Sequence, residues 1–279
     1  MTSAISPTLA LHDGREIPQL GFGVYKTPPA QTAEAVSVAL AAGYRHIDTA
    51  TLYANEQGVG EAVRASGLDR DEVFVTTKVW NADQGYDATL AAFAESERLL
   101  GLGVVDLYLI HWPQPARGLF VDTYRALETL KGEGRVRSIG VSNFEPEHLE
   151  ALREAGLETP VLNQVELHPR LQQEQVRAYG ERHGILTEAW APLGRGSVLD
   201  DPVLAGIAAE HGISPAQAVL RWHLQQGRIA IPKSVTPERI RDNIDVFGFV
   251  LDEVQMAAID ALDAGESGRT GKVPGEFND

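Results

Sequence analysis

Short runs of β-branched and other apolar residues alternate with longer amphipathic segments along almost the whole chain. The apolar runs predict strands at residues 20–23, 45–48, 73–79, 105–111, 136–142, 160–166, 186–192 and 228–234. The amphipathic segments predict helices at residues 29–43, 85–101, 120–134, 171–184, 201–212, 214–227 and 237–248. Alternation of strand and helix is typical of a parallel sheet, and eight strands favour one (β/α)8 TIM barrel over residues 1–279 with extra C-terminal helices.

The two ends of the chain depart from this alternation. Asp13-Gly14 lies between two apolar-containing runs in residues 8–21, which predicts an N-terminal β-hairpin able to close the barrel floor. Residues 265–279 are rich in glycine and polar side chains, so we expect a mobile tail. Such a tail offers little apolar surface with which to cover the opposite end of the barrel.

A doubly wound open sheet would show the same alternation. Its phosphate-binding fingerprint, G-x-G-x-x-G, is missing, because neither Gly21-Phe22-Gly23 nor Gly194-Arg195-Gly196 is followed by the third glycine. A P-loop and a G-x-S-x-G nucleophile elbow are missing as well. The sequence therefore favours the barrel.

Composition and charge narrow the classes of partner. Of the 279 residues, 43% are hydrophobic and 23% are charged, and the net charge of −15 disfavours nucleic acid and anionic membranes. An anionic ligand would need a local cluster of Lys and Arg. The chain has no cysteine, no signal-like N-terminus and no apolar stretch of the roughly 20 residues that cross a bilayer. We expect a cytoplasmic monomer.

Four polar residues lie at or just after the carboxyl ends of three neighbouring predicted strands: Asp48, Tyr53, Lys78 and His111. The carboxyl ends of barrel strands carry the catalytic groups in this architecture. Tyrosine can donate a proton, although its usual pKa is about 10, and a nearby ammonium held by a carboxylate would lower that pKa. A histidine can orient a substrate oxygen. Each residue alone has an ordinary structural explanation, but the set is suited to metal-free carbonyl reduction.

Several longer motifs surround these residues. They are HIDTATLY (46–53), DLYLIHWP (106–113), SIGVSNF (138–144), NQVELHP (163–169), WAPLGRG (190–196) and IPKSVTPERIRDN (231–243). Together they resemble the aldo-keto reductase family over nearly the whole chain. The resemblance is nearest to the prokaryotic branch that includes 2,5-diketo-D-gluconic acid reductases.

The resemblance implies a role for each matching position. Tyr53 would be the general acid, Lys78 with Asp48 would lower its pKa, His111 would direct the carbonyl oxygen, and NADPH would supply the hydride. The implied NADP-binding residues are Ser142, Asn143 and Gln164 at the carboxamide, Trp190 stacked on the nicotinamide, Leu193 and Gly194 at the pyrophosphate, Lys233, Ser234, Thr236 and Arg239 at the 2′-phosphate, and Asn243 at the adenine. Alternatively, Ser142 and Asn143 cap the next helix, and the basic cluster is a solvated helix start.

The substrate site is less well defined by the sequence. Phe22, Tyr25, Trp80 and Trp112 fall in strand-end positions and could line it, although each is equally suited to the core. We expect small aldehydes, ketones or dicarbonyls, such as diketo sugar acids or methylglyoxal-like compounds. Glu166 and His168 have the spacing of a metal-ligand pair, but no third ligand is evident, so we expect a structural hydrogen bond and no metal.

Two other functions fit the same fold. A non-catalytic relative could bind NADP as a sensor or interaction subunit, and a barrel hydrolase or isomerase would not bind NADPH at all. The intact set of four polar residues argues against the first, because a protein that has lost catalysis has no need to keep them.

Overall fold

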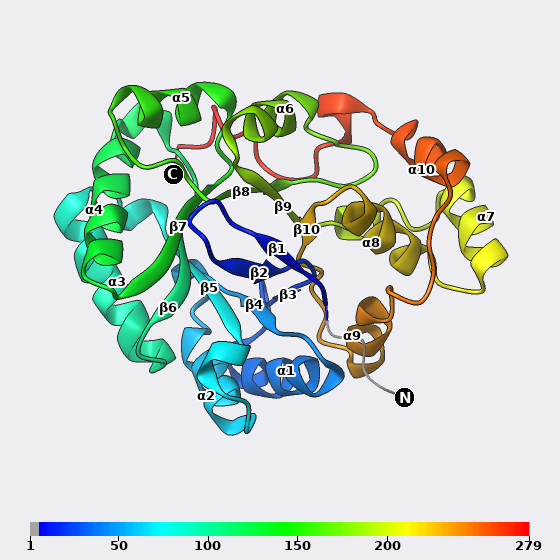
Figure 1. The fold of residues 1–279 in the computed structure, drawn as a ribbon, viewed down its shortest axis with the longest axis horizontal. Coiled ribbons are helices and arrows are strands. Elements are labelled where there is room, and N and C mark those ends of the chain that lie inside the picture. Colours follow the sequence, from blue (N-terminus) through cyan, green and yellow to red (C-terminus); the bar gives the residue numbers. More distant parts are fainter. Residues whose placement is uncertain (1–5, 279) are drawn as a thin grey trace.

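The computed structural model describes residues 6–278, and a ring of eight parallel strands forms its centre (Figure 1). The strands are β3 (Phe22–Gly23), β4 (His46–Asp48), β5 (Phe74–Val79), β6 (Val105–Ile110), β7 (Val136–Ser142), β8 (Leu162–Glu166), β9 (Leu186–Trp190) and β10 (Ile229–Ala230), hydrogen-bonded in chain order. Parallel bridges from Leu20 to Ala230 and from Gly23 to Lys233 join the first strand to the last. The predicted (β/α)8 barrel is confirmed.

Helices surround the ring of strands. They are α1 (Pro29–Ala42), α2 (Glu56–Ala65), α3 (Tyr86–Leu100), α4 (Phe120–Gly132), α5 (Pro146–Glu154), α6 (Glu174–His183), α7 (Pro202–His211), α8 (Pro215–Gln225), α9 (Pro237–Ile244) and α10 (Glu253–Asp260). The pattern missed α2, α5 and α10. Gly58 and Gly60 weaken the helical signal of α2, yet a Cβ at Gly60 would lie 1.9 Å from the Leu100 carbonyl oxygen. The close approach of α2 to the end of α3 therefore requires a glycine.

The predicted N-terminal hairpin closes one end of the barrel. Its strands β1 (Thr8–Ala10) and β2 (Glu16–Pro18) pair antiparallel, with Leu9 opposite Ile17, and they lie across the centre of the ring in Figure 1. Leu11 and Ile17 are buried in one cluster with Leu107, Leu162 and other residues of the barrel interior. This end is the barrel floor, because it faces the amino ends of the strands.

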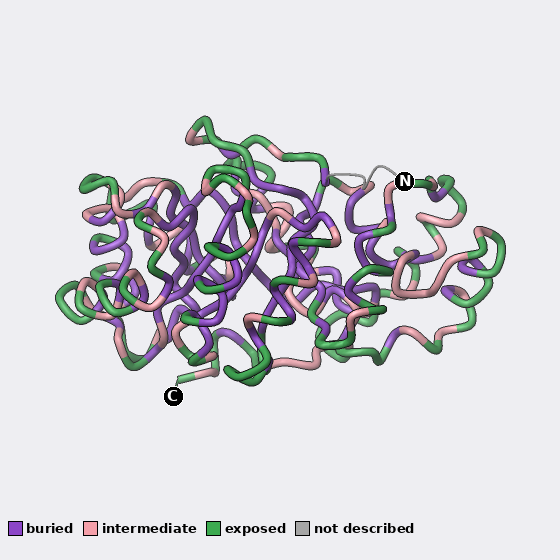
Figure 2. The backbone as a smooth tube through the Cα atoms, turned by 90° about the horizontal axis from the view of Figure 1, so that it is seen from below, coloured by how far each residue is buried: buried purple, intermediate pink, exposed green. Residues whose placement is uncertain are grey.

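Buried residues are concentrated in the barrel wall and its interior (Figure 2). Between strands and helices, aromatic rings fill the layer, as where Phe93 meets Tyr108 at a centroid distance of 4.8 Å. Phe22 belongs to this layer, with 1% of its surface exposed and its ring 5.6 Å from that of Tyr44. Its assignment to the substrate site is wrong, because alternate strand residues face opposite sides of the sheet and Phe22 faces the helices. Among the described residues, no helix is long and apolar enough to span a membrane.

Candidate active site

A buried ion pair lies at the carboxyl ends of β4 and β5. The Lys78 Nζ donates to Asp48 Oδ1 at 2.7 Å, to Asp48 Oδ2 at 2.8 Å and to the Thr49 carbonyl oxygen at 2.9 Å. Lys78 is 0% exposed and Asp48 is 2% exposed. An ammonium has three N–H donors, so every donor of Lys78 has an acceptor. These hydrogen bonds and the carboxylate of Asp48 allow Lys78 to remain charged at a fully buried position.

Tyr53 and His111 complete the group. Tyr53 ends the short 3-10 turn Thr51–Tyr53 that follows β4, and its ring centroid lies 5.3 Å from the Lys78 Nζ and 5.7 Å from the centroid of His111. His111 directly follows β6 and is buried. The structure therefore brings together all four residues that the sequence singled out.

The protonation states of Tyr53 and His111 suit a proton donor and a neutral hydrogen-bond partner. Burial, and then the charge of Lys78, hold the pKa of His111 well below its usual value, so its imidazole is neutral. Burial raises the pKa of Tyr53 well above its usual value, and the carboxylate of Asp48 adds to this. The net direction is opposite to the lowering expected from Lys78, because burial is the largest cause of the shift. Tyr53 stays protonated at neutral pH.

The residues expected at the nicotinamide form one hydrogen-bonded group. Ser142 Oγ donates to the Gln164 carbonyl oxygen at 2.7 Å, and Asn143 Nδ2 donates to the His111 carbonyl oxygen at 2.9 Å. Trp190 Nε1 donates to Asn143 Oδ1 at 2.8 Å. The alternative that Ser142 and Asn143 cap the next helix is wrong, because α5 begins at Pro146 and Glu145 is its N-cap.

A buried carboxyl that the sequence analysis overlooked lies behind this group. Gln164 Nε2 donates to Asp48 Oδ2 at 2.8 Å and to Glu188 Oε1 at 2.6 Å. Burial, and then the nearby charge of Asp48, raise the pKa of Glu188 to about 8. The amide of Gln164 thus connects the carboxylate of Asp48 to a carboxyl group that is protonated at neutral pH. The available signal was a single glutamate inside the predicted strand at 186–192.

Stability should therefore fall with rising pH, and Glu188→Gln should flatten that dependence. The usual pKa of glutamate is 4.5, and folding raises that of Glu188 to about 8. Between these values the unfolded chain has lost a proton that the folded protein keeps, so the free energy of unfolding declines as pH rises. Urea unfolding midpoints across this range measure the effect. Glu253→Gln, at an exposed position on α10, should retain the wild-type dependence, and an equal slope in all three proteins would contradict the prediction.

A basic cluster lies in the segment from Lys233 to the start of α9. Lys233, Thr236 and Arg239 are exposed, and neither Lys233 nor Arg239 forms an ion pair within residues 6–278. Ser234 and Asn243 are buried beside them. Two unpaired cations on a chain of net charge −15 fit a phosphate, because guanidinium and ammonium groups bind phosphate oxygens strongly.

Along the chain, the expected pyrophosphate residues lie between Trp190 and the basic cluster. Leu193 precedes the short turn Gly194–Gly196 after β9, which is the strand that ends at Trp190. Gly194 has a φ of 55°, and a Cβ there would lie 2.9 Å from Ser197 Oγ. The residues expected to bind NADP therefore share the carboxyl end of the barrel, and their donor groups fit its amide and phosphates.

Aromatic rings line the entrance to the catalytic group. Tyr25 lies 5.1 Å from Tyr53, and Trp80 lies 5.0 Å from His111, both measured between ring centroids. Trp112 packs at 4.8 Å against Phe277, which comes from the C-terminal tail and also lies 6.5 Å from Trp80. Three of the four expected rings thus lie at the entrance, and the sequence analysis missed Phe277 because the tail is otherwise polar.

The tail contacts the barrel through Glu166 at the end of β8. Glu166 accepts hydrogen bonds from the backbone N–H of Thr270 at 2.7 Å and of Gly271 at 2.8 Å. A Cβ at Gly271 would lie 2.5 Å from the Trp190 ring, so glycine allows this close approach. Glu166 Oε1 also lies 3.3 Å from His168 Nε2, and this contact is the structural hydrogen bond expected for the pair. The carboxylate of Glu166 anchors the tail.

Replacing Glu166 with alanine should release the tail. Hydrogen bonds to a charged group contribute about 1.5–3 kcal/mol, so amide hydrogen exchange at Thr270 and Gly271 should accelerate by about ten- to a hundredfold. Burial opposes ionisation of Glu166, but hydrogen bonds from His168, Thr270 and Gly271 outweigh it and lower the pKa from 4.5 to about 2. The anchor therefore acts fully above pH 4.5 and is lost as pH falls toward 2.

Glu276→Ala is the matched control, because Glu276 is an exposed carboxylate of the same tail. Its exchange rates at Thr270 and Gly271 should equal those of the wild type. Unchanged exchange in Glu166→Ala would show that other contacts hold the tail, such as the 3.0 Å hydrogen bond from Gln114 Nε2 to the Phe277 carbonyl oxygen.

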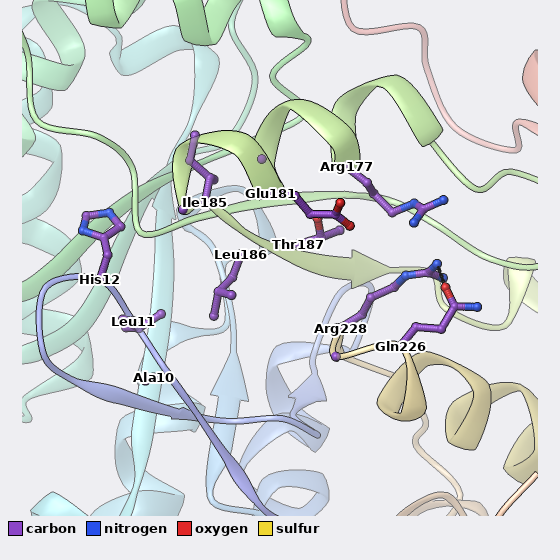
Figure 3. Close-up of a pocket in the computed structure, with 13 residues that line it drawn as sticks. Ala10, Leu11, His12, Arg177, Glu181, Ile185, Leu186, Thr187, Gln226 and Arg228 are labelled. Carbon is purple, nitrogen blue, oxygen red and sulfur yellow. Dashed lines mark hydrogen bonds between the residues drawn. The ribbon is translucent and has the colours of Figure 1, made fainter.

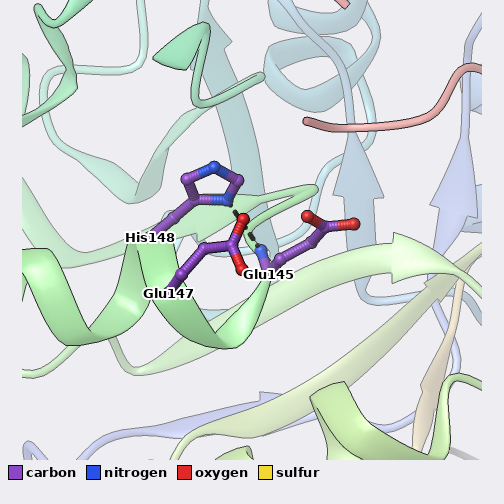
Figure 4. A group of neighbouring side chains, drawn as sticks. All are labelled: Glu145, Glu147 and His148. Carbon is purple, nitrogen blue, oxygen red and sulfur yellow. Dashed lines mark hydrogen bonds between the residues drawn. The ribbon is translucent and has the colours of Figure 1, made fainter. Parts of the chain in front are cut away.

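One group of potential metal ligands lies outside the catalytic group. Glu145, Glu147 and His148 each offer a ligand atom within 4.8 Å of the others at the start of α5 (Figure 4). His148 Nδ1 already accepts a hydrogen bond from the backbone N–H of Glu145 at 3.0 Å. Helix capping accounts for this arrangement, so we assign no metal to it.

A (β/α)8 barrel with a Tyr, Lys, Asp and His group at its carboxyl end defines a class of oxidoreductases, and comparisons identify the family. The sequence profile of the Aldo/keto reductase family matches residues 19–264. The chain belongs to this family.

Relatives match over nearly the full chain. A glyoxal reductase from Bacillus subtilis is 48% identical, and the match covers 99% of this chain and 99% of the relative. A methylglyoxal reductase from Yersinia pestis is also 48% identical, and the match covers 98% of each chain. The crystal structure of a Gox0644 variant in complex with NADPH superposes with a TM-score of 0.94 at 52% identity, covering 98% of this chain and 99% of that one.

Proposed function

We propose that the protein reduces small aldehydes, ketones and dicarbonyls to alcohols with NADPH, and that Tyr53 is the general acid. The observation that carries this proposal is the buried Lys78–Asp48 ion pair, with Nζ 2.7 Å from Oδ1, beside the rings of Tyr53 and His111. Membership of the aldo/keto reductase family and a structural neighbour in complex with NADPH support the reaction class and the cofactor.

When bound, NADPH supplies a hydride to the carbonyl carbon. Ser142, Asn143 and Gln164 present amide and hydroxyl groups suited to its carboxamide, and Trp190 presents an aromatic plane. The donors of Lys233 and Arg239 suit the 2′-phosphate. These residues would hold the cofactor beside the catalytic group and leave the hydroxyl of Tyr53 for the substrate.

Side chains of the protein supply the proton that the carbonyl oxygen gains during reduction. The neutral imidazole of His111 offers an N–H donor that orients the carbonyl oxygen, and Tyr53 donates its phenolic proton to that oxygen as negative charge develops. The charge of Lys78 stabilises the tyrosinate that remains, while Asp48 keeps the ammonium in position. General acid assistance of this kind contributes about 10²–10⁴ in rate.

The entrance favours compact substrates. Tyr25, Trp80, Trp112 and Phe277 surround it with aromatic surface, which suits flat dicarbonyls. A glyoxal reductase and a methylglyoxal reductase among the relatives point to the same compounds, and diketo sugar acids of the 2,5-diketo-D-gluconic acid type extend the proposed range. The cytoplasmic location, the monomeric state and the absence of nucleic-acid binding stay predictions.

The test is NADPH oxidation, followed by nicotinamide absorbance, with glyoxal, methylglyoxal, 2,5-diketo-D-gluconate and a series of aliphatic aldehydes. We expect turnover of the dicarbonyls with only a shallow rise of kcat/KM along the aldehyde series. Binding of NADPH without turnover of any carbonyl would favour the NADP-binding sensor instead. A steep, sustained rise, approaching the gain from about 0.8 kcal/mol for each buried methylene, would show a long apolar pocket and contradict the proposed substrate class.

A further inference from the structure

A cavity lies at the barrel floor, away from the catalytic group. Its volume is about 460 Å³, and it is bounded by the N-terminal hairpin, α6, the start of β9 and the loop between α8 and β10 (Figure 3). Leu186 and Thr187 line it at the amino end of β9, whereas Trp190 lies at the opposite end of that strand. The cavity is therefore separate from the proposed cofactor and substrate sites.

Two arginines line the same end of this cavity. Figure 3 shows the guanidinium groups of Arg177 and Arg228 close together, with Leu11 and His12 at the other end. Arg228 is only 3% exposed, and its Nη1 has no hydrogen-bond partner among the described residues. Neither arginine forms an ion pair within that part of the chain. A buried cation without a counter-charge is costly, which makes this position suited to an anion.

The nearby polar residues compensate that charge only in part. Gln226 accepts a hydrogen bond from Arg228 Nη2 and donates one to Asp260 Oδ1 at 2.8 Å. The side-chain amide of Gln226 therefore lies between Arg228 and the carboxylate of Asp260. Glu181 lines the cavity but is exposed and lies beyond ion-pair distance of both arginines. Burial, and then the charge of Arg177, lower the pKa of Arg228 to about 9, although Asp260 and Glu181 partly offset this.

We propose that this cavity binds a small organic anion, with its carboxylate or phosphate between Arg177 and Arg228 and its apolar body toward Leu11 and Leu186. A guanidinium presents a planar set of donors that matches either anionic group. Leu11, Ile185 and Leu186 give the lining an apolar part beside polar residues such as His12 and Thr187, and the volume of the cavity exceeds the needs of an inorganic anion alone. The Arg228 guanidinium is already ordered, because it packs 4.6 Å from the centroid of Trp222 and donates to Gln226.

The experiment uses the full chain saturated with NADP, so that anions cannot bind at Lys233 and Arg239. Calorimetric titration with hexanoate, phenyl phosphate and inorganic phosphate measures affinity. We expect the two organic anions to bind more tightly than inorganic phosphate. Arg228→Met removes the guanidinium but keeps an unbranched side chain of similar length, and it should weaken binding of both organic anions by at least about tenfold, as the loss of a charged hydrogen bond implies.

Three further variants make the result specific to the cavity. Arg177→Gln, at a partly exposed position, should give a similar loss and serves if Arg228→Met fails to fold. Glu181→Gln removes a like charge and should strengthen binding. Arg182→Gln removes an exposed arginine of the same helix outside the cavity and should leave both affinities within about twofold. The proposal would be overturned if Arg182→Gln bound the organic anions with the same affinity as Arg228→Met and Arg177→Gln. It would also be overturned if the wild type bound inorganic phosphate as tightly as the organic anions.

Discussion

Replacing Tyr53 with phenylalanine should lower kcat for carbonyl reduction by about 10²–10⁴-fold while leaving NADPH affinity nearly unchanged. The substitution removes only the hydroxyl, and the ring retains its contacts with Tyr25 and His111. Because the pKa of Tyr53 is raised, the wild-type hydroxyl is protonated throughout the neutral range, so the variant lacks a proton donor at every pH of interest. Steady-state kinetics with methylglyoxal and fluorescence titration with NADPH measure the two quantities.

Tyr25→Phe provides the matched control. Tyr25 lies 5.1 Å from Tyr53 between ring centroids, but it is 42% exposed and its hydroxyl has no assigned part in proton transfer. Its kcat should remain within about threefold of wild type, as expected for an exposed side chain at the entrance. If Tyr53→Phe retained more than about a tenth of wild-type activity, which is above the range for loss of a general acid, another group would have to supply the proton.

The catalytic group could be predicted because its positions depend only on strand order. Once Asp48, Lys78 and His111 are placed at the ends of three neighbouring strands, a parallel barrel brings them to one end whatever the details of packing. Their electrostatics could not be predicted in this way. The pKa of Tyr53 depends first on the burial of its hydroxyl and then on the nearby carboxylate of Asp48, and strand order alone gives neither.

Residues that act through long-range contacts were harder to identify. Glu188 is one glutamate within an apolar run, and only the pairing of β8 with β9 places it opposite Gln164. The composition of the tail is polar, yet Glu166 holds its backbone and Phe277 packs against Trp112. Backbone hydrogen bonds to a polar segment leave almost no signal in hydrophobic periodicity, so the sequence did not predict these contacts.

Replacing both Lys233 and Arg239 with alanine should weaken NADPH far more than NADH. Each charged hydrogen bond to the 2′-phosphate contributes about 1.5–3 kcal/mol, which is roughly one to two orders of magnitude in affinity. NADH lacks that phosphate, so its affinity should change little. Both side chains are exposed and form no ion pair within residues 6–278, so their loss should not disturb the fold. Fluorescence titrations with the two cofactors at low and raised salt measure the preference.

Arg241→Ala separates a specific contact from a general loss of positive charge. Arg241 is exposed on the same helix, α9. Its replacement removes one positive charge but none of the contacts assigned to the phosphate. It should change the affinity for NADPH by less than about threefold, because exposed charges in water interact weakly. Raised salt should narrow the preference of the wild type for NADPH, since the 2′-phosphate contacts are partly solvated. Equal weakening of NADPH and NADH in the double variant would mean that Lys233 and Arg239 support the loop and do not recognise the phosphate.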